Sequence, residues 1–282
     1  MIAYPVHFAR LVKIEHTVFA LPFAYVGAFL AVDAVPGAAE LLWITLAMVG
    51  ARSLAMALNR LIDAEIDARN PRTAGRELPA GRLSRTQVLA FCAASLAVFL
   101  VAVWQLDPLV RWLWPVPVVG FVVYPHLKRV TWLAHLWLGA VLGLAPVGAW
   151  VALTGELPWQ AWALGGAVAA WVAGFDLLYA LLDLDVDRRE GLHSWATRWG
   201  ERGTFAAARA LHVLTAALLA AAGTGLDVGF LYWLGAGVVA ALLVYEHSIV
   251  GPGDLRRLDA AFFTVNGVIS VLFGLFVLVD SI

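Results

Sequence analysis

The sequence predicts an all-α, polytopic membrane protein with nine transmembrane helices around a central cavity. Hydrophobic residues make up 62% of the 282 residues and charged residues only 14%, whereas charged residues alone approach about a quarter of a soluble domain. Mean hydropathy is +0.83. The apolar residues are gathered into long runs, and about 20 consecutive apolar residues suffice to cross a bilayer as a helix.

The apolar runs give the predicted spans in chain order. They are 17–32, 41–58, 88–106, 112–124, 133–154, 159–182, 205–223, 229–250 and 258–279. The fourth run is short and is interrupted by Pro115 and Pro117, which lack the amide hydrogen that a helix interior uses. Arg10 and Lys13 precede the first run as they would in a signal peptide, but that run is long and eight others follow, so we expect it to be retained.

The charged residues between the runs alternate in sign from one connection to the next. Lys and Arg fall on one side of the predicted bundle, from Arg10 and Lys13 to Arg256 and Arg257, whereas the other side carries Arg111 among acidic residues. By the positive-inside rule the basic side is cytoplasmic. The sequence therefore predicts a multi-pass protein of the cell inner membrane, with its N-terminus in the cytoplasm and its C-terminus outside. The net charge of −1 hides this asymmetry and says nothing about nucleic acid. No basic stripe with interleaved aromatic residues occurs in the loops, so we expect no nucleic-acid partner.

Two polar motifs occur where long apolar runs end. They are Asn59-x₃-Asp63-x₃-Asp67 and Tyr179-x₃-Asp183-x₃-Asp187. The spacing i, i+4, i+8 places each set on one face of a helix. Carboxylates at a helix end often do no more than face water, but two matched motifs on the same side, each followed by arginines, favour a function. Four carboxylates at the mouth of a bundle suit Mg²⁺ that bridges a diphosphate, because Mg²⁺ takes one or two carboxylates plus substrate phosphates.

The matched motifs also indicate an internal repeat. They start 120 residues apart (179 minus 59) and four predicted spans separate them, so a repeat would have parallel topology. We expect one domain over 1–282, with repeated halves at about 1–130 and 131–257 and the ninth helix outside the repeat.

Basic residues near the first motif are candidates for binding a diphosphate. Arg72 and Arg76 follow the carboxylates within a few residues, and a guanidinium matches phosphate oxygens in a bidentate fork. Arg82 and Arg85 are better explained as positive-inside loop residues. Lys128, after the fourth run, could reach a phosphate or extend to the membrane surface.

Four segments together resemble the UbiA superfamily of intramembrane aromatic prenyltransferases. The segments are Asn59-Arg60-Leu61-Ile62-Asp63-Ala64-Glu65-Ile66-Asp67, the loop from Arg72-Thr73 through Arg76 to Leu78-Pro79-Ala80-Gly81, Tyr124-Pro125 to Lys128-Arg129, and Asp176-x₂-Tyr179-Ala180-x₂-Asp183-x₃-Asp187 followed by Gly191 and Ser194. The resemblance implies a nine-helix bundle with a central cavity and Mg²⁺ between the two Asp-rich motifs. It also implies transfer of a prenyl group from a prenyl diphosphate to an aromatic quinone precursor.

The resemblance also implies roles for individual residues. Metal ligands would be Asn59, Asp63, Asp67, Asp183 and Asp187. The diphosphate and the reacting centre would be bound by Arg72, Arg76, Tyr124, Lys128 and Tyr179, with Asp176 and Ser194 also assigned to substrate binding. The four aspartates and Tyr179 would be catalytic, and Tyr179 could face an allylic cation through its ring or bind diphosphate through its hydroxyl. The base that removes the ring proton stays open between an Asp and the released diphosphate.

The acceptor is less closely defined. Many 4-hydroxybenzoate enzymes have an Asp-Lys-Pro-Ile-Gly-like segment in the first helix, whereas this chain has Lys13-Ile14-Glu15-His16-Thr17-Val18-Phe19-Ala20-Leu21-Pro22-Phe23. That segment looks more like the archaeal 4-hydroxybenzoate-type members and the enzymes of the futalosine route to menaquinone. His193 also stands where Lys is common. We therefore expect Mg-dependent transfer of a polyprenyl group to a 4-hydroxybenzoate-type acid for ubiquinone biosynthesis, with dihydroxynaphthoate prenylation for menaquinone as the alternative.

Other functional classes remain open on the sequence alone. A cation-coupled secondary transporter would use the same aspartates to carry Na⁺ or H⁺, but its charges should lie near the membrane midplane. A prenyl- or quinone-binding accessory protein would need the cavity but not four carboxylates. Glu15 and His16 could orient the acceptor or form a simple helix-end pair. Cys92 is expected in the core, the Trp and Phe residues in packing or at the membrane surface, and His135, His212 and His247 in packing or interfacial positions.

Overall fold

The computed structural model describes residues 4–13 and 17–282. Glu15 and His16, which could orient an acceptor, lie outside these residues. The described chain is helical, and its only β-type pairing is an isolated bridge between Gly251 and Asp254. The helices in order are α1 (Tyr4–Leu11), α2 (Thr17–Val32), α3 (Ala38–Ile62), α4 (Ala64–Arg69), α5 (Arg85–Val103), α6 (Val110–Leu113), α7 (Pro115–Leu127), α8 (Ala134–Thr154), α9 (Trp159–Tyr179), the 3₁₀-helix η2 (Ala180–Asp183), α10 (Leu184–Arg189), α11 (Trp195–Thr224), α12 (Phe230–Ile249), α13 (Leu258–Ala260), the π-helix η3 (Ala261–Val265) and α14 (Asn266–Asp280).

Seven helices of the described chain are long and apolar enough to cross a membrane. They are Ala38–Ile62, Arg85–Val103, Ala134–Thr154, Trp159–Arg189, Trp195–Thr224, Phe230–Ile249 and Ala261–Asp280. The first and fourth predicted spans are also helical, as α2 and α7, but α2 has 16 residues and α7 has 13. Pro115 begins α7 and Pro125 lies near its end, so proline chemistry limits that helix at both ends. The structure therefore confirms an all-helical membrane bundle, while nine spans stay a prediction.

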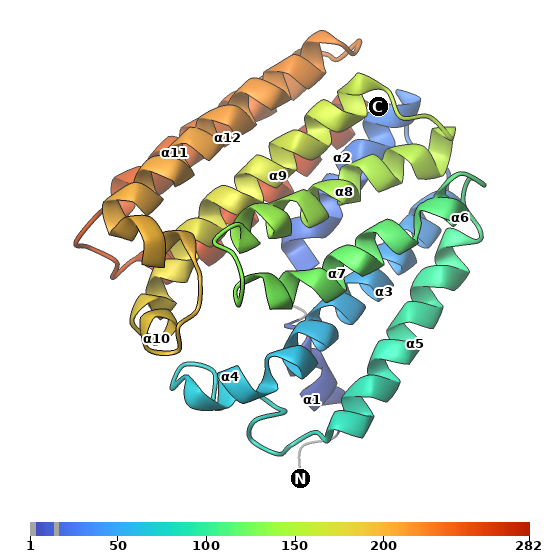
Figure 1. Cartoon of the computed structure of the whole chain (residues 1–282). Coiled ribbons are helices and arrows are strands. Elements are labelled where there is room, and N and C mark those ends of the chain that lie inside the picture. The colour runs from blue at the N-terminus through green and yellow to red at the C-terminus, as the bar shows by residue number, and fades with distance from the viewer. Residues whose placement is uncertain (1–3, 14–16) are drawn as a thin grey trace.

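The long helices lie side by side, and both polar motifs occur at the same end of the bundle (Figure 1). Helices α1, α4 and α10 gather at this end, and the C-terminus lies at the opposite end. Helices α8 and α9 approach closely through small residues. A Cβ added to Gly139 would lie 2.2 Å from the carbonyl oxygen of Ala169, and one added to Gly143 would lie 2.4 Å from that of Gly165. Such close packing of small residues is typical of helix pairs in membranes.

The largest apolar core packs along α9 from Ala161 to Phe175. Trp171, Tyr232 and Phe273 are among its fully buried side chains, and Phe23 of α2 lies 5.0 Å from Trp171 between ring centroids. Cys92 lies buried in a separate cluster between α3 and α5, which confirms its expected place in the core. The core thus holds α9 in place, and the C-terminal end of α9 carries the start of the second motif at Tyr179.

Each motif coincides with a break in its helix. α3 ends at Ile62 and α4 begins at Ala64, with Asp63 between them at φ −92° and ψ 4°. The N–H of Asp63 still donates to the Asn59 carbonyl at 3.0 Å, and the N–H of Asp67 to the Asp63 carbonyl at 2.8 Å. The predicted four-residue stacking therefore persists through this break. In the second motif the prediction of one continuous α-helix is wrong, because η2 replaces the α-turn that ends at Asp183 and winds more tightly, with about three residues per turn.

Candidate active site

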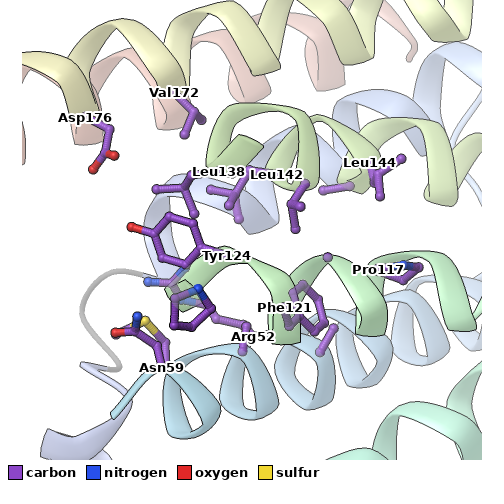
Figure 2. A pocket seen from close by; sticks show the side chains of 18 of the residues that line it. Arg52, Asn59, Pro117, Phe121, Tyr124, Leu138, Leu142, Leu144, Val172 and Asp176 are labelled. Carbon is purple, nitrogen blue, oxygen red and sulfur yellow. The ribbon is translucent and has the colours of Figure 1, made fainter. Parts of the chain in front are cut away.

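A cavity of about 640 Å³ opens between α3, α7, α8 and α9 and receives both motifs at one end. Figure 2 shows its two chemically different parts. Asn59, Asp176 and the hydroxyl of Tyr124 gather at the polar end. Leucines of α8 and the Phe121 ring of α7 form the apolar part. The same cavity can therefore hold a charged group and a hydrocarbon group at once.

Asp63 of the first motif is buried and accepts bonds from three side chains. Its carboxylate lies 2.5 Å from Lys128 Nζ, 3.1 Å from an Arg129 guanidinium nitrogen and 3.2 Å from Asn59 Nδ2. Its side chain is only 3% exposed, and a buried carboxylate needs such partners. These bonds tie the segment after α7 to the end of α3. The structure thus places Lys128 beside the motif, and it adds Arg129, which the sequence had not singled out.

Asp67 is bound by the loop that follows it. The Arg76 guanidinium lies 2.7 Å from both carboxylate oxygens of Asp67. The Thr73 hydroxyl donates to the Asp67 carbonyl at 2.9 Å. The loop therefore turns back onto its own motif and holds Arg76 at the cavity, where the sequence predicted it.

Asp183 of the second motif is bound by residues of the first half of the chain. Asn70 Nδ2 lies 3.0 Å from Asp183 Oδ1, and Arg72 Nε lies 2.9 Å from the same oxygen. Arg72 also pairs with Asp183 through its terminal nitrogen. Burial lowers the pKa of the Arg72 guanidinium, but the hydrogen bond and charge of Asp183 outweigh burial, so that pKa is raised above its ordinary value. Arg72 is therefore a permanent cation between the two motifs.

Tyr179 lies beside Arg72 and under an aromatic residue of the last helical segment. An Arg72 nitrogen lies 3.3 Å from the Tyr179 hydroxyl, and its guanidinium carbon is 5.3 Å from the ring centroid. The Phe262 ring stacks on Tyr179 at 4.0 Å between centroids. Phe262 belongs to the π-helix η3, and π-turns of this kind are frequent at functional sites. Phe262 was missed because no sequence pattern separates it from the other apolar residues near it.

Asp187 and Ser194 lie next to each other at the cavity. Both residues line the cavity, and the Ser194 hydroxyl lies close to the Asp187 carboxylate. The same hydroxyl accepts the backbone N–H of Thr197 at 3.2 Å and so caps the start of α11. Ser194 thus has a capping role in addition to the predicted place near substrate, and the His193 N–H donates to the Lys128 carbonyl at 2.7 Å.

Three further polar residues line the cavity, and none of them was assigned to it from the sequence. His135 Nδ1 lies 2.7 Å from Asp176 Oδ2, so the expectation that His135 only packs or faces the membrane surface is wrong. Arg52 lines the cavity one to two turns of α3 before Asn59 (Figure 2). Arg60, for which the sequence predicted no role of its own within the first motif, is buried inside α3 and donates to Asn59 Oδ1 at 3.3 Å. An isolated His or Arg has no motif spacing that would have revealed these positions.

Trp and Phe side chains also line the cavity, although from the sequence we expected them in packing or at the membrane surface. Trp114, Phe121, Trp162 and Phe175 are among the lining residues. Helix periodicity could not separate these rings from the many others that face lipid or neighbouring helices.

The polar end has the chemistry of a magnesium diphosphate site. Asp63, Asp67, Asp183 and Asp187 all line the cavity with the amides of Asn59 and Asn70. Within residues 4–13 and 17–282, no three His, Cys, Asp or Glu side chains converge closely enough to hold a metal ion by themselves. Mg²⁺ seldom needs such a cage, because it commonly takes one or two carboxylates together with phosphate oxygens. The oxygen donors and the nearby cations therefore fit Mg²⁺ bound with a diphosphate better than a metal ion bound alone.

Comparison with known proteins gives one consistent result. Residues 20–268 match the UbiA prenyltransferase family. A 4-hydroxybenzoate octaprenyltransferase of Aliivibrio fischeri (strain MJ11) is 30% identical over 87% of this chain and 85% of its own length. One of Cupriavidus necator is 31% identical over 90% of both chains. The structure of a UbiA homolog from Aeropyrum pernix K1 superposes with a TM-score of 0.86 at 33% identity, covering 95% of this chain and 99% of that one.

Proposed function

The chain belongs to the UbiA prenyltransferase family, and from that premise we propose that it transfers a polyprenyl group from a prenyl diphosphate to an aromatic acid of the 4-hydroxybenzoate type. The reaction would depend on Mg²⁺ and would serve ubiquinone biosynthesis. The names of relatives at about 30% identity support this acceptor. The observation that carries the proposal is the single cavity with carboxylates and cations at one end and hydrocarbon at the other.

The polar end would bind the diphosphate. Mg²⁺, when bound by the aspartates, would neutralise diphosphate charge and so favour departure of that group. Arg72, Arg76 and Lys128 already lie at the carboxylates, and their N–H groups would donate to phosphate oxygens as negative charge develops there. The allylic C–O bond would then ionise without a strong nucleophile.

Tyr179 and Phe262 would cover the cation that forms. Their stacked rings lie next to Arg72, which is one diphosphate ligand of this proposal. The face of an aromatic ring attracts a cation by about 0.5–2 kcal/mol and excludes water. The rings therefore favour capture of the cation by the aromatic acceptor over capture by water.

Arg52 provides the binding site for the carboxylate of the acceptor. It lines the cavity between the polar end and the apolar wall (Figure 2), and a guanidinium pairs with a carboxylate through two parallel hydrogen bonds. Leu138, Leu142 and Phe121 continue the wall beyond it. An acid anchored at Arg52 would lie beside a prenyl chain held against that wall.

The arrangement is less suited to a cation-coupled transporter. A transporter of this kind would hold its ion near the bilayer midplane, whereas Asp63, Asp67 and Asp183 lie at one end of the bundle and pair with Lys and Arg side chains. We further propose that this end faces the cytoplasm of the inner membrane, with the N-terminus inside and the C-terminus outside, since the basic loops lie there.

The test is an assay with defined donor and acceptor. Purified protein in lipid vesicles would receive Mg²⁺, an octaprenyl diphosphate and either 4-hydroxybenzoate or 1,4-dihydroxy-2-naphthoate, and the product would be identified by mass. We expect octaprenylated 4-hydroxybenzoate and free diphosphate, and neither product when EDTA replaces Mg²⁺. Prenylation of the naphthoate alone would move the enzyme to menaquinone biosynthesis, and release of no diphosphate with either acceptor would disprove the proposal.

A further inference from the structure

We propose that His135, oriented by Asp176, is the base that removes the ring proton from the aromatic acceptor. The inference rests on the proposed prenyl transfer. That reaction replaces a ring hydrogen by a prenyl carbon, so a proton has to leave the acceptor in every turnover.

The two side chains form a histidine–carboxylate pair in the cavity. His135 Nδ1 lies 2.7 Å from Asp176 Oδ2, and both residues line the cavity with side chains 12% and 16% exposed. An ionised carboxylate only accepts hydrogen bonds, so this bond assigns the imidazole hydrogen to Nδ1. The lone pair of Nε2 is then available, and Nε2 has no hydrogen-bond partner among the described residues. A carboxylate in this position fixes the imidazole tautomer and stabilises the imidazolium that forms. Histidine is an effective base in this arrangement.

The pair lies where the acceptor ring has to be. Asp176 precedes Asp183 by seven residues, so it is about 10 Å farther along the helical segment from the proposed diphosphate site. Tyr179 lies one turn away toward that site, and Leu138 of the apolar wall lies one turn beyond His135 on α8. The pair thus stands between the ring that would cover the allylic cation and the wall that would hold the prenyl chain.

Other candidate bases near the cavity are already engaged. Asp63, Asp67 and Asp183 each pair with a Lys or Arg side chain, and such pairing stabilises the ionised form against taking up a proton. Asp187 forms no ion pair among the described residues, and in the proposed function it binds Mg²⁺ with the other three motif aspartates. His135 Nε2, by contrast, has no hydrogen-bond partner among the described residues, and the Asp176 carboxylate lies ready to balance the charge that the imidazole would gain.

The proposed step balances as follows. The allylic C–O bond breaks and its electron pair leaves with diphosphate. The ring carbon next to the hydroxyl group uses a π pair to form the new C–C bond, and the ring becomes a cation. The C–H bond at that carbon then breaks, its electrons restore the aromatic ring, and the proton goes to His135 Nε2. The imidazolium then releases this proton to water, which returns His135 to its neutral state.

The experiment compares His135→Gln and Asp176→Asn with the wild type and with His126→Gln. His126 is an exposed histidine of α7 outside the cavity lining and serves as the matched control. Each protein would be assayed for prenylated product, for diphosphate release, and for the isotope effect of 4-hydroxybenzoate deuterated at the two positions next to its hydroxyl group. Thermal unfolding in the same vesicles would verify the fold of each variant.

We expect His135→Gln to form product about a hundredfold more slowly, since a positioned base contributes roughly 10²–10⁴ in rate. Its isotope effect should rise clearly above the wild-type value, because proton removal would become rate-limiting. Diphosphate release should fall much less, as the donor ionises and water captures the cation. Asp176→Asn should show the same pattern in weaker form, and His126→Gln should match the wild type.

Three results would overturn the inference. One is unchanged product formation in folded His135→Gln; another is an equal loss of product and diphosphate release with no rise in the isotope effect, which would assign His135 a structural role. If His135→Gln does not fold, the Asp176→Asn variant decides the question. A folded Asp176→Asn protein with no rise in the isotope effect would also overturn the inference. A wild-type enzyme that releases diphosphate but prenylates no aromatic acid would instead disprove the proposed function, and the role of His135 with it.

Discussion

Asn70 Nδ2 lies 3.0 Å from Asp183 Oδ1, although 113 positions separate the two residues in the chain. The loop after the first motif is therefore bonded directly to the second motif. Arg72 reaches the same carboxylate from the same loop. These two bonds join the loop to the second motif through protein side chains and hold the charges of the polar end in fixed positions. Preorganised charge of this kind reduces the rearrangement needed at the moment of reaction.

The first prediction concerns Asp63. Asp63→Asn should lower product formation by at least about a hundredfold, as expected when a ligand of the Mg²⁺ that would stabilise the developing diphosphate charge is lost. The substitution keeps the side-chain volume but removes the charge that pairs with Lys128 and Arg129, so the unfolding temperature should also fall, and activity would be compared at a temperature where the variant is folded. The matched control is Asp185→Asn, an exposed aspartate between the two carboxylates of the second motif. Wild-type turnover by Asp63→Asn at saturating Mg²⁺ would contradict the assignment of the first motif.

The second prediction separates the donor from the acceptor. Arg72→Ala should raise the KM for the prenyl diphosphate about 10- to 100-fold, because a hydrogen bond to a charged group is worth about 1.5–3 kcal/mol. The KM for the aromatic acid should change much less. Arg85→Ala is the control, since Arg85 is exposed and pairs with Glu65 at 3.3 Å. Equal loss of affinity for both substrates would point to collapse of the whole loop.

The third prediction concerns metal removal. Asp63, Asp67 and Asp183 are already balanced by side-chain cations, so EDTA should abolish activity without lowering the unfolding temperature. Mg²⁺ and the donor diphosphate added together should raise that temperature by about 5 °C, whereas either alone should raise it less. Unfolding in EDTA would show that the metal ion is part of the fold.

The fourth prediction concerns a buried polar group away from the cavity mouth. Asn266 accepts from Trp171 Nε1 at 2.6 Å and donates to Glu246 Oε1 at 3.1 Å, and it is fully buried. Asn266→Ala should destabilise the protein by about 2–4 kcal/mol, because the Trp171 and Glu246 side chains and the Ala261 carbonyl lose their bonds. Ser248→Ala, which removes an exposed bond to the Tyr245 carbonyl, should have almost no effect. Denaturation of both variants in the same detergent makes the comparison, and similar stability would show that water replaces the Asn266 amide.

The sequence was sufficient to predict those features of the fold and site that depend on residue spacing or on the placement of charges. Apolar runs located the helices, and the four-residue spacing placed Asp63 and Asp67 together at the cavity. It could not show that Asn70 binds Asp183, because that contact depends on how the loop crosses between distant helices. It also missed the pairing of His135 with Asp176, since a single histidine at a helix start has no period to reveal its partner.

The sequence also gave no sign of the π-turn that places Phe262 on Tyr179. The Asn266 amide donates to the Ala261 carbonyl at 3.2 Å, and this side-chain bond is part of how the turn is held. Regular hydrophobic periodicity cannot predict such a local change of helix type. The parallel repeat stays a prediction, although the breaks at Asp63 and at Asp183 are each followed by a six-residue helix.

The last prediction tests which side of the membrane the polar end faces. Cysteine would be introduced at Gly75 in the loop after the first motif and, in a separate variant, at Glu156 between α8 and α9. Both positions are exposed, a Cβ at Gly75 meets no atom within 4 Å, and the native Cys92 is buried, so background labelling should be low.

A membrane-impermeant maleimide should label the Glu156→Cys variant in intact cells and the Gly75→Cys variant only after the membrane is opened. The reason is that the basic loops remain in the cytoplasm during insertion, where a water-soluble aromatic acid and Mg²⁺ would reach the polar end directly. The prenyl chain would enter from lipid, because exposing it to water would cost about 0.8 kcal/mol per CH₂. Labelling of the Gly75→Cys variant in intact cells would reverse the orientation and require both soluble substrates to come from outside.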